Sequence, residues 1–217
     1  VVAVFVVGAT AFYALAFQRV YVEDHPAVTA SEWINSNVPR GTGIVSDNHW
    51  DEFVPNLSSY DVWQFPVYEM DTLEKMNTLA GKLAASEYVV FYSSRPYASV
   101  ARDPARFPFS NQYYQGLFNG NLGYNLDREF LNYPELFGVT FRDDAVGRAG
   151  LQTPDPLNPG DEPRVVLDLG YADDNVVGYD HPRVLLFKNT GHLDESIIGI
   201  RLKISTQVAG GRGVGLL

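Results

Sequence analysis

The chain of 217 residues contains no cysteine. Disulfide bonds, thiolate zinc sites and cysteine nucleophiles are therefore excluded, although the lack of cysteine does not decide the compartment. Basic residues are also scarce, because 16 lysines and arginines stand against 26 acidic residues and give a net charge of -10. Nucleic-acid phosphates and anionic lipid headgroups repel a chain so acidic, so we expect no nucleic-acid partner.

The common catalytic signatures are missing as well. The sequence has no GxSxG, Walker A or HExxH pattern, and no GxGxxG at a strand-to-helix turn. A glycine run at residues 210–215 lies in the C-terminal tail and is a poor candidate for a phosphate-binding loop. The sequence therefore offers no ready-made catalytic motif.

An apolar segment opens the chain. Residues 1–17 contain no charged side chain. A helix of this length covers roughly 25 Å, slightly less than the hydrocarbon thickness of a bilayer. Because the chain begins at Val1 without an initiator methionine, we interpret residues 1–20 as a truncated transmembrane helix. A signal peptide and a buried core helix are the alternatives, but no basic segment precedes the run and no clear A-x-A site follows it.

The charges after the apolar run indicate its orientation. Arg19 is followed by Glu23 and Asp24, and the next lysine or arginine is Arg40. Cytoplasmic flanks are usually rich in lysine and arginine. We therefore expect residues 21–205 to form one domain on the extracytoplasmic face of a cell envelope. Within and after it, we expect an irregular loop at residues 143–163 and a flexible tail at residues 206–217.

Helical and strand patterns alternate through this domain. Helices are predicted at residues 29–37, with Thr29 and Glu32 as a capping box, at 72–86 with Asp71 as the N-cap, at 111–119 and at 192–203. Strands are predicted at residues 43–46, 87–92, 130–133, 137–141, 164–169 and 183–188. The run at 87–92 does not alternate, which is typical of a buried parallel strand. We therefore expect a three-layer-like α/β domain with a mostly parallel sheet.

A polar group follows the first predicted strand. Asp47, His49, Asp51 and Glu52 lie in one loop, with Trp50 among them. Carboxylates suit hard divalent cations and imidazole suits transition metals, while an indole ring can stack on a sugar. The spacing matches no standard metal motif, however, and a hydrogen-bonded turn explains the same residues. We keep the five as candidate binding residues, with a divalent cation as the one cofactor considered.

Two other positions have a functional and a structural interpretation. Arg95, near Ser93, Ser94 and Tyr97, could bind a phosphate or an acidic sugar at a strand end, or it could be a loop arginine paired with an acid. His181 lies in an Asp-His-Pro segment, where a catalytic dyad competes with a structural contact. We favour the structural interpretation of both, keep Arg95 as a candidate binding residue and assign no catalytic residue.

Several segments resemble one family. They are residues 30–42 (ASEWINSNVPRGT), 46–55 (SDNHWDEFVP), 85–126 and 179–189. Together they resemble the Chlor_Arch_YYY family of polytopic membrane proteins, which is related to glycosyltransferases of the protein O-mannosyltransferase type. The resemblance runs from about residue 26 to residue 189. Its most specific parts are Tyr113 and Tyr114 with residues 117–120, and residues 179–184; the segment 143–163 is longer than the family pattern.

The resemblance implies a domain that follows the last spanning helix of a many-helix enzyme. In such glycosyltransferases the catalytic acidic residue lies in the first outer loop, which would be far upstream of Val1. The resemblance therefore implies an accessory domain of a glycosyltransferase-like protein that uses lipid-linked sugar, and that is not catalytic alone. Its implied partners are the membrane, other membrane helices and a glycan or protein acceptor.

Two other functions are open at this point. One is a structural or interaction subunit, anchored by a single helix, in a membrane or cell-surface assembly. The other is a soluble α/β enzyme that uses the loop at residues 47–52. The sequence upstream of Val1 separates the first from the glycosyltransferase, because many further spans with an acidic pair in the first outer loop would support the enzyme.

Overall fold

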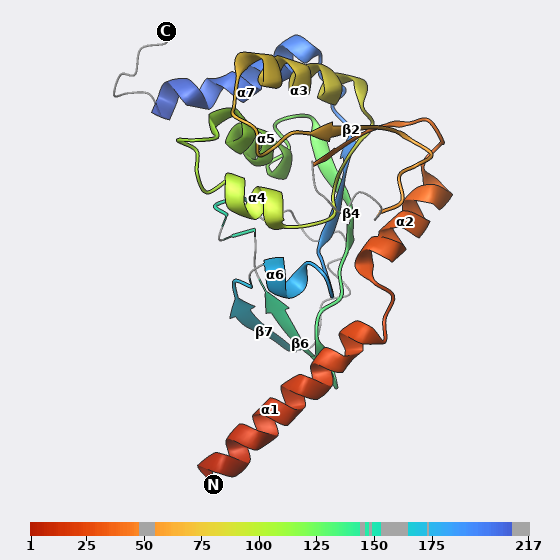
Figure 1. The fold of residues 1–217 in the computed structure, drawn as a ribbon, viewed down its shortest axis with the longest axis vertical. Helices are drawn as coiled ribbons and strands as arrows, with labels where there is room; N and C mark the ends of the chain where they lie inside the picture. The colour runs from red at the N-terminus through yellow and green to blue at the C-terminus, as the bar shows by residue number, and fades with distance from the viewer. Residues whose placement is uncertain (48–54, 144–145, 148, 153–164, 173, 210–217) are drawn as a thin grey trace.

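The computed structural model describes residues 1–47, 55–143, 146–147, 149–152, 165–172 and 174–209. It confirms an N-terminal apolar helix followed by an α/β domain (Figure 1). The elements in chain order are α1 (Val2–Gln18), η1 (Arg19–Tyr21), α2 (Pro26–Asn37), β1 (Gly43–Asp47), β2 (Asp61–Phe65), α3 (Leu73–Ala85), β3 (Tyr88–Phe91), α4 (Arg95–Val100), α5 (Pro108–Phe118), β4 (Tyr124–Phe130), β5 (Glu135–Leu136), β6 (Val139–Asp143), β7 (Val165–Gly170), α6 (Asp174–Val177), β8 (Val184–Asn189) and α7 (Glu195–Ala209).

The main sheet has the strand order β2-β1-β3-β8-β4. Strand β1 pairs in parallel with β2 and β3, whereas β8 pairs in antiparallel fashion with β3 and β4. Half of the strand pairs are thus antiparallel, and the prediction of a mostly parallel sheet is wrong. Strand β8 is buried on both faces whichever way it runs, so its apolar sequence carries no information on its direction.

Alternate residues of the central strands face two separate cores. Val45, Val89 and Phe187 lie in one core with residues of α3, α5 and α7. Ile44, Val90 and Leu186 lie in the other core with residues of α2. Helices therefore cover both faces of the main sheet, because successive side chains of a strand project to opposite sides.

The N-caps of two helices differ from the sequence prediction. Helix α2 begins at Pro26, and the Nδ1 atom of His25 accepts the backbone N–H of Ala27, so Thr29 lies inside the helix. Thr72, not Asp71, caps α3, because its hydroxyl accepts the backbone N–H of Lys75. Proline at the first helical position explains the earlier start of α2, since its missing N–H needs no partner there.

A smaller sheet lies beside the end of α1. It has the order β5-β6-β7, with β5 and β6 antiparallel and β6 and β7 parallel. The segment expected as an irregular loop at residues 143–163 lies mostly outside the described residues. Helix α7 extends to Ala209, past the expected end of the domain at residue 205, and residues 210–217 also lie outside the description.

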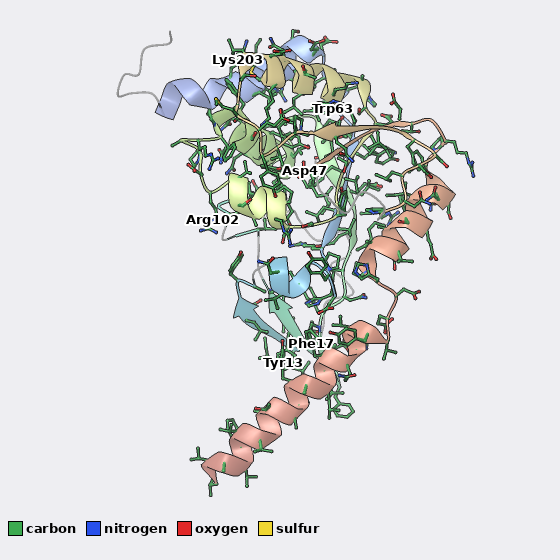
Figure 2. All side chains as sticks on the ribbon, in the orientation of Figure 1. Tyr13, Phe17, Asp47, Trp63, Arg102 and Lys203 are labelled. Carbon is green, nitrogen blue, oxygen red and sulfur yellow. The ribbon has the colours of Figure 1, made fainter. Side chains whose placement is uncertain are left out.

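Helix α1 is exposed over its first part and packed over its last part. Phe5 is 76% exposed, whereas Ala16 and Val20 are buried. Tyr13 packs edge-on against Phe141 of β6 with the ring centroids 5.0 Å apart; Figure 2 shows Tyr13 and Phe17 where the helix meets the domain. Among the described residues, the helical stretch Val2–Asn37 alone is long and apolar enough to cross a membrane, a test that a signal sequence also passes.

Candidate functional site

The carboxyl ends of β1 and β3 lie next to each other in the sheet. Ligands of open α/β sheets usually bind at this edge. A cleft of about 680 Å³ opens there, and the described residues that line it include Ser46, Asn56, Tyr60, Asp61, Gln64 and Tyr92. Ser46 and Tyr92 come from the ends of the two strands, and Gln64 comes from β2. The cleft is therefore the candidate binding site.

Asp47 is the last residue of β1 and is only 3% exposed. Its Oδ2 atom accepts a hydrogen bond of 3.0 Å from the hydroxyl of Tyr114. Its Oδ1 atom has no hydrogen-bond partner among the described residues. Burial raises the pKa of Asp47 from 3.8 to about 8, and the Tyr114 hydrogen bond opposes this shift in part. At neutral pH the side chain is therefore mostly a protonated acid.

The carboxyl of Asp47 faces away from the cleft. Val45 belongs to the core formed with α3, α5 and α7, and Asp47 lies two residues further on the same strand face, against Tyr114 of α5. Ser46 projects to the opposite face and lines the cleft. Figure 2 places Asp47 inside the domain near α4 and α5. The arrangement suits a carboxyl that positions buried tyrosines, and it gives this group no contact with a ligand in the cleft.

Arg95 begins α4 directly after the end of β3. Its backbone N–H donates to the hydroxyl oxygen of Ser93 over 3.1 Å, and its guanidinium donates to Oδ1 of Asn175 in α6 over 3.4 Å. Arg95 thus ties α4 to α6. The described cleft lining includes neither Arg95 nor Asp47.

The four remaining predicted site residues, His49, Trp50, Asp51 and Glu52, lie outside the described residues. A metal site would need several ligand side chains close together. Within the described ranges, no group of three or more histidine, aspartate or glutamate side chains could hold a metal ion. The divalent cation stays a prediction that depends on the loop after Asp47.

The segment 179–184 packs against the end of α1 and the residues that follow it. Tyr21 forms a side-chain hydrogen bond with Asp180, and Nε2 of His25 lies 3.1 Å from the backbone oxygen of Tyr179. The ring of His181 packs edge-on against Phe17 with the centroids 5.6 Å apart. Burial lowers the pKa of His181, against the raising effect of Asp143 and Asp180. His181 is thus a neutral ring in a junction, in line with its structural interpretation.

A buried ion pair follows this segment. The guanidinium of Arg183 pairs with the carboxylate of Glu129 on β4, and both side chains are largely buried. Desolvation is the largest single effect and lowers the pKa of Arg183, but Glu129, with smaller contributions from Tyr97 and Tyr133, outweighs it and the pKa is raised. Burial also raises the pKa of the neighbouring Tyr133 to about 12. An arginine at the start of an apolar strand is the only sequence signal for this pair.

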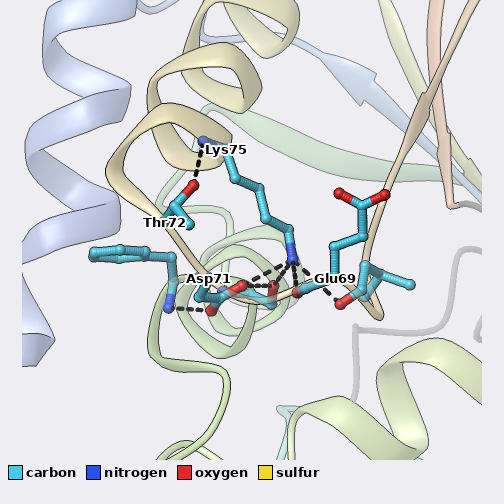
Figure 3. A network of polar contacts seen from close by, with 7 residues as sticks. Glu69, Asp71, Thr72 and Lys75 are labelled. Carbon is cyan, nitrogen blue, oxygen red and sulfur yellow. Dashed lines mark hydrogen bonds and ion pairs between the residues drawn. The ribbon is translucent and has the colours of Figure 1, made fainter.

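A second buried network joins α3 to α5 (Figure 3). Oδ1 of Asp71 accepts from Nζ of Lys75 over 2.8 Å, and Nζ also donates to the backbone oxygen of Glu69. The two side chains of this ion pair are 1% and 7% exposed. Because the backbone and side-chain partners of Asp71 are all internal, the network is structural. It has no contact with the cleft lining described above.

The two segments on which the family resemblance depends most have structural surroundings. Tyr113 and Tyr114 are fully buried in the core between the sheet and α5. Residues 179–184 form the junction with α1 and lead into β8. Comparison with protein-family models, with curated proteins and with solved structures finds no match to this chain.

Proposed function

We propose that the chain is a membrane-tethered accessory domain on the extracytoplasmic side of a glycosyltransferase-like membrane protein. In this proposal the domain helps to hold a lipid-linked sugar or its acceptor, and the catalytic acid belongs to another part of the protein. The observation that carries the proposal is the packed junction between α1 and the domain. It includes the buried Ala16 and Val20 and the contacts of Phe17 and Tyr21 with residues 179–181.

The junction supports the tether because it joins an apolar helix to a folded domain without a flexible linker. An ion pair between Arg19 and Glu135 of β5, 3.3 Å long, adds to the aromatic contacts. The exposed apolar side chains of α1 would face lipid. The scarcity of basic residues between Arg19 and Arg40 supports the outer face.

The cleft at the strand ends supports a binding role. Its lining combines amide, hydroxyl and aromatic groups from Gln64, Ser46, Tyr60 and Tyr92. Such groups suit the hydroxyls and ring faces of a sugar. The resemblance of residues 26–189 to a glycosyltransferase-related family supports a lipid-linked sugar as the ligand class.

The absence of cysteine gives a direct test of the orientation. A single cysteine at the exposed Arg102 (R102C) should react with a membrane-impermeant maleimide in right-side-out vesicles from cells that express the chain. The same variant should not react in sealed inside-out vesicles. The reverse pattern would contradict an outer-face domain.

The ligand class needs a separate test. A polyprenyl-phosphate hexose should bind the chain in detergent micelles, as measured by titration calorimetry. Gln64→Ala should weaken binding about fivefold, the loss expected for one hydrogen bond of about 1 kcal/mol. Gln112→Ala on α5 is the matched control and should bind as the unsubstituted chain does. If the hexose does not bind while the domain stays folded and tethered, the interaction-subunit function is favoured.

A further inference from the structure

The small sheet presents an apolar face whose members can be assigned from the strand register. Val139 pairs with Val165 and Phe141 pairs with Leu167 along the parallel strands β6 and β7. Side chains of paired residues project to the same face of a sheet. The opposite face carries the ion pair between Arg142 and Asp168, 2.8 Å long, which confirms the assignment. One face of the sheet therefore carries four apolar side chains, and the other carries Thr140 and Val166 followed by the ion pair.

Helix α1 covers only part of the apolar face. Phe141 is 8% exposed because Phe12 and Tyr13 pack on it, with ring centroids 6.1 Å and 5.0 Å away. On the β7 side of the same face, Val165 and Leu167 are exposed by 47% and 45%. Leu169, which lies at the register shift after Asp168, is exposed by 55%. The uncovered residues thus lie beside the helix.

The turn between β5 and β6 adds a fourth exposed apolar side chain. Phe137 is 91% exposed and has a φ of 53°. The backbone N–H of Val165 donates to the oxygen of Gly138, which places the turn at the start of β7. We refer to Phe137, Val165, Leu167 and Leu169 as the apolar rim. Exposed apolar residues gathered on and beside an edge strand usually mark a surface that a protein partner or a membrane covers.

The position of the rim along α1 favours the membrane as the environment that covers it. Phe141 contacts Phe12 and Tyr13, which precede Arg19, the first charged residue, by six to seven positions. At about 1.5 Å per residue, this contact lies roughly 10 Å deeper than Arg19 along the helix axis. Amphipathic surfaces that rest on membranes bury their apolar side to about this depth. Tyr13 lies at this level and Tyr21 lies just beyond Arg19, and both are exposed, as interfacial aromatic residues are.

We propose that the apolar rim inserts into the interfacial layer of the lipid bilayer next to α1. The small sheet is then a second membrane contact, and together with α1 it fixes the tilt of the domain. The exposed ion pair of Arg142 and Asp168 lies on the opposite face of the sheet and stays in water. This inference depends on the tether by α1 proposed above.

The test uses single cysteines labelled with the fluorophore NBD in the otherwise cysteine-free chain. The chain is reconstituted into phosphatidylcholine vesicles, with and without lipids that carry a nitroxide near the headgroup. Labels at Phe137 (F137C) and Leu167 (L167C) report on the rim, and a label at Phe5 (F5C) reports on the span. Leu73→Cys on α3 is the matched control, because Leu73 is an exposed apolar residue at 59% on a helix far from α1 (Figure 1).

We expect the labels at residues 137 and 167 to emit at shorter wavelength than the label at residue 73. We also expect the nitroxide lipid to quench them severalfold more strongly. If the label at residue 5 is in lipid but those at 137 and 167 match the control, the rim does not contact the membrane and the tether stands. If the label at residue 5 is itself in water, the tether and the rim are both wrong. Shielding of the rim labels without quenching by lipid would assign the rim to a protein partner and would overturn the inference.

Discussion

Asp71, two residues before α3, accepts two hydrogen bonds from Ser110 of α5. Its Oδ2 atom accepts the backbone N–H of Ser110 over 2.8 Å, and its Oδ1 atom accepts the hydroxyl over 2.7 Å. Oδ2 also accepts the backbone N–H of Phe109. The carboxylate thus caps the first turn of α5 from outside, and the residue before α5, Phe107, has no side chain that could do so.

Asp71→Asn should destabilise the protein strongly. The substitution removes the charge that neutralises the buried Lys75, and breaking a buried pair on one side costs about 3–5 kcal/mol. Urea unfolding of the full chain in mild detergent measures the change in free energy of unfolding. Glu74→Gln, on the exposed side of the same helix, is the control and should change stability by less than about 0.5 kcal/mol. A similar small change for both variants would contradict the role given to Asp71.

The pair of Arg183 and Glu129 has an exposed counterpart, which gives a matched comparison. Glu129→Gln leaves a largely buried guanidinium without its carboxylate and should cost about 3 kcal/mol. Asp168→Asn breaks the pair with Arg142, whose side chains are 44% and 66% exposed, and should cost at most about 1 kcal/mol. Thermal unfolding of both variants measures the difference. Equal losses would show that burial does not govern these two pairs.

Asp47 should make the stability depend on pH. The folded protein keeps the proton of Asp47 up to about pH 8, whereas an unfolded chain releases it near 3.8. Between these values the folded state binds more protons, so the Asp47 contribution is complete below about pH 4 and is lost as the pH rises to 8. The loss is at most about 1.4 kcal/mol per pH unit.

Asp47→Asn should remove this part of the pH dependence. The measurement is urea unfolding from pH 4.5 to pH 8. As the pH rises, the free energy of unfolding of the variant should increase relative to that of the unsubstituted chain. Asp61→Asn replaces an exposed aspartate at the start of β2 and serves as the control. A constant difference for Asp47→Asn would mean that Asp47 is ionised in the folded protein.

The junction of α1 with the domain should be rigid. Ala16→Leu adds three carbons at a position that is fully buried, and should push the helix off the small sheet and residues 179–181. Spin labels at Phe5 (F5C) and Arg102 (R102C) should give a narrow distance distribution by pulsed EPR, and Ala16→Leu should broaden it. Ala9→Leu, the same change at an exposed position of α1, should leave the distribution narrow. A broad distribution in the unsubstituted chain would show that the helix is not fixed.

Local patterns predicted the elements whose sequence is periodic or strongly apolar. The runs around Val45 and Val89 are strands β1 and β3, and the apolar spacing from Leu73 to Leu83 lies in α3. Strand β2 was missed, because residues 61–65 are short and only partly buried. The strand predicted at residues 130–133 begins at Phe130, whereas strand β4 ends at this residue.

Relationships between distant residues could not be predicted from local patterns. Asp71 precedes a helical run, so the sequence indicated a cap for α3, whereas the backbone groups that it caps, those of Phe109 and Ser110, lie almost forty residues away. The contact between His181 and Phe17 likewise joins the two ends of the chain. The sequence predicted that Asp47 and Arg95 follow two strands, and they lie at the ends of β1 and β3, although neither is among the described residues that line the cleft. It could not show that the carboxyl of Asp47 turns toward α5, because that depends on which face α5 covers.

The order of the strands constrains how the protein is made. Strand β8 lies between β3 and β4 in the main sheet but is the last strand in the sequence. Until residue 189 has left the ribosome, β3 has no partner on one edge and β4 has none at all within this sheet. Residues 1–17 precede every strand of this sheet in the sequence, so in the proposed tether they can enter the membrane before the sheet is complete. The sheet is therefore completed late in biosynthesis, from pairings that are distant in sequence and form slowly.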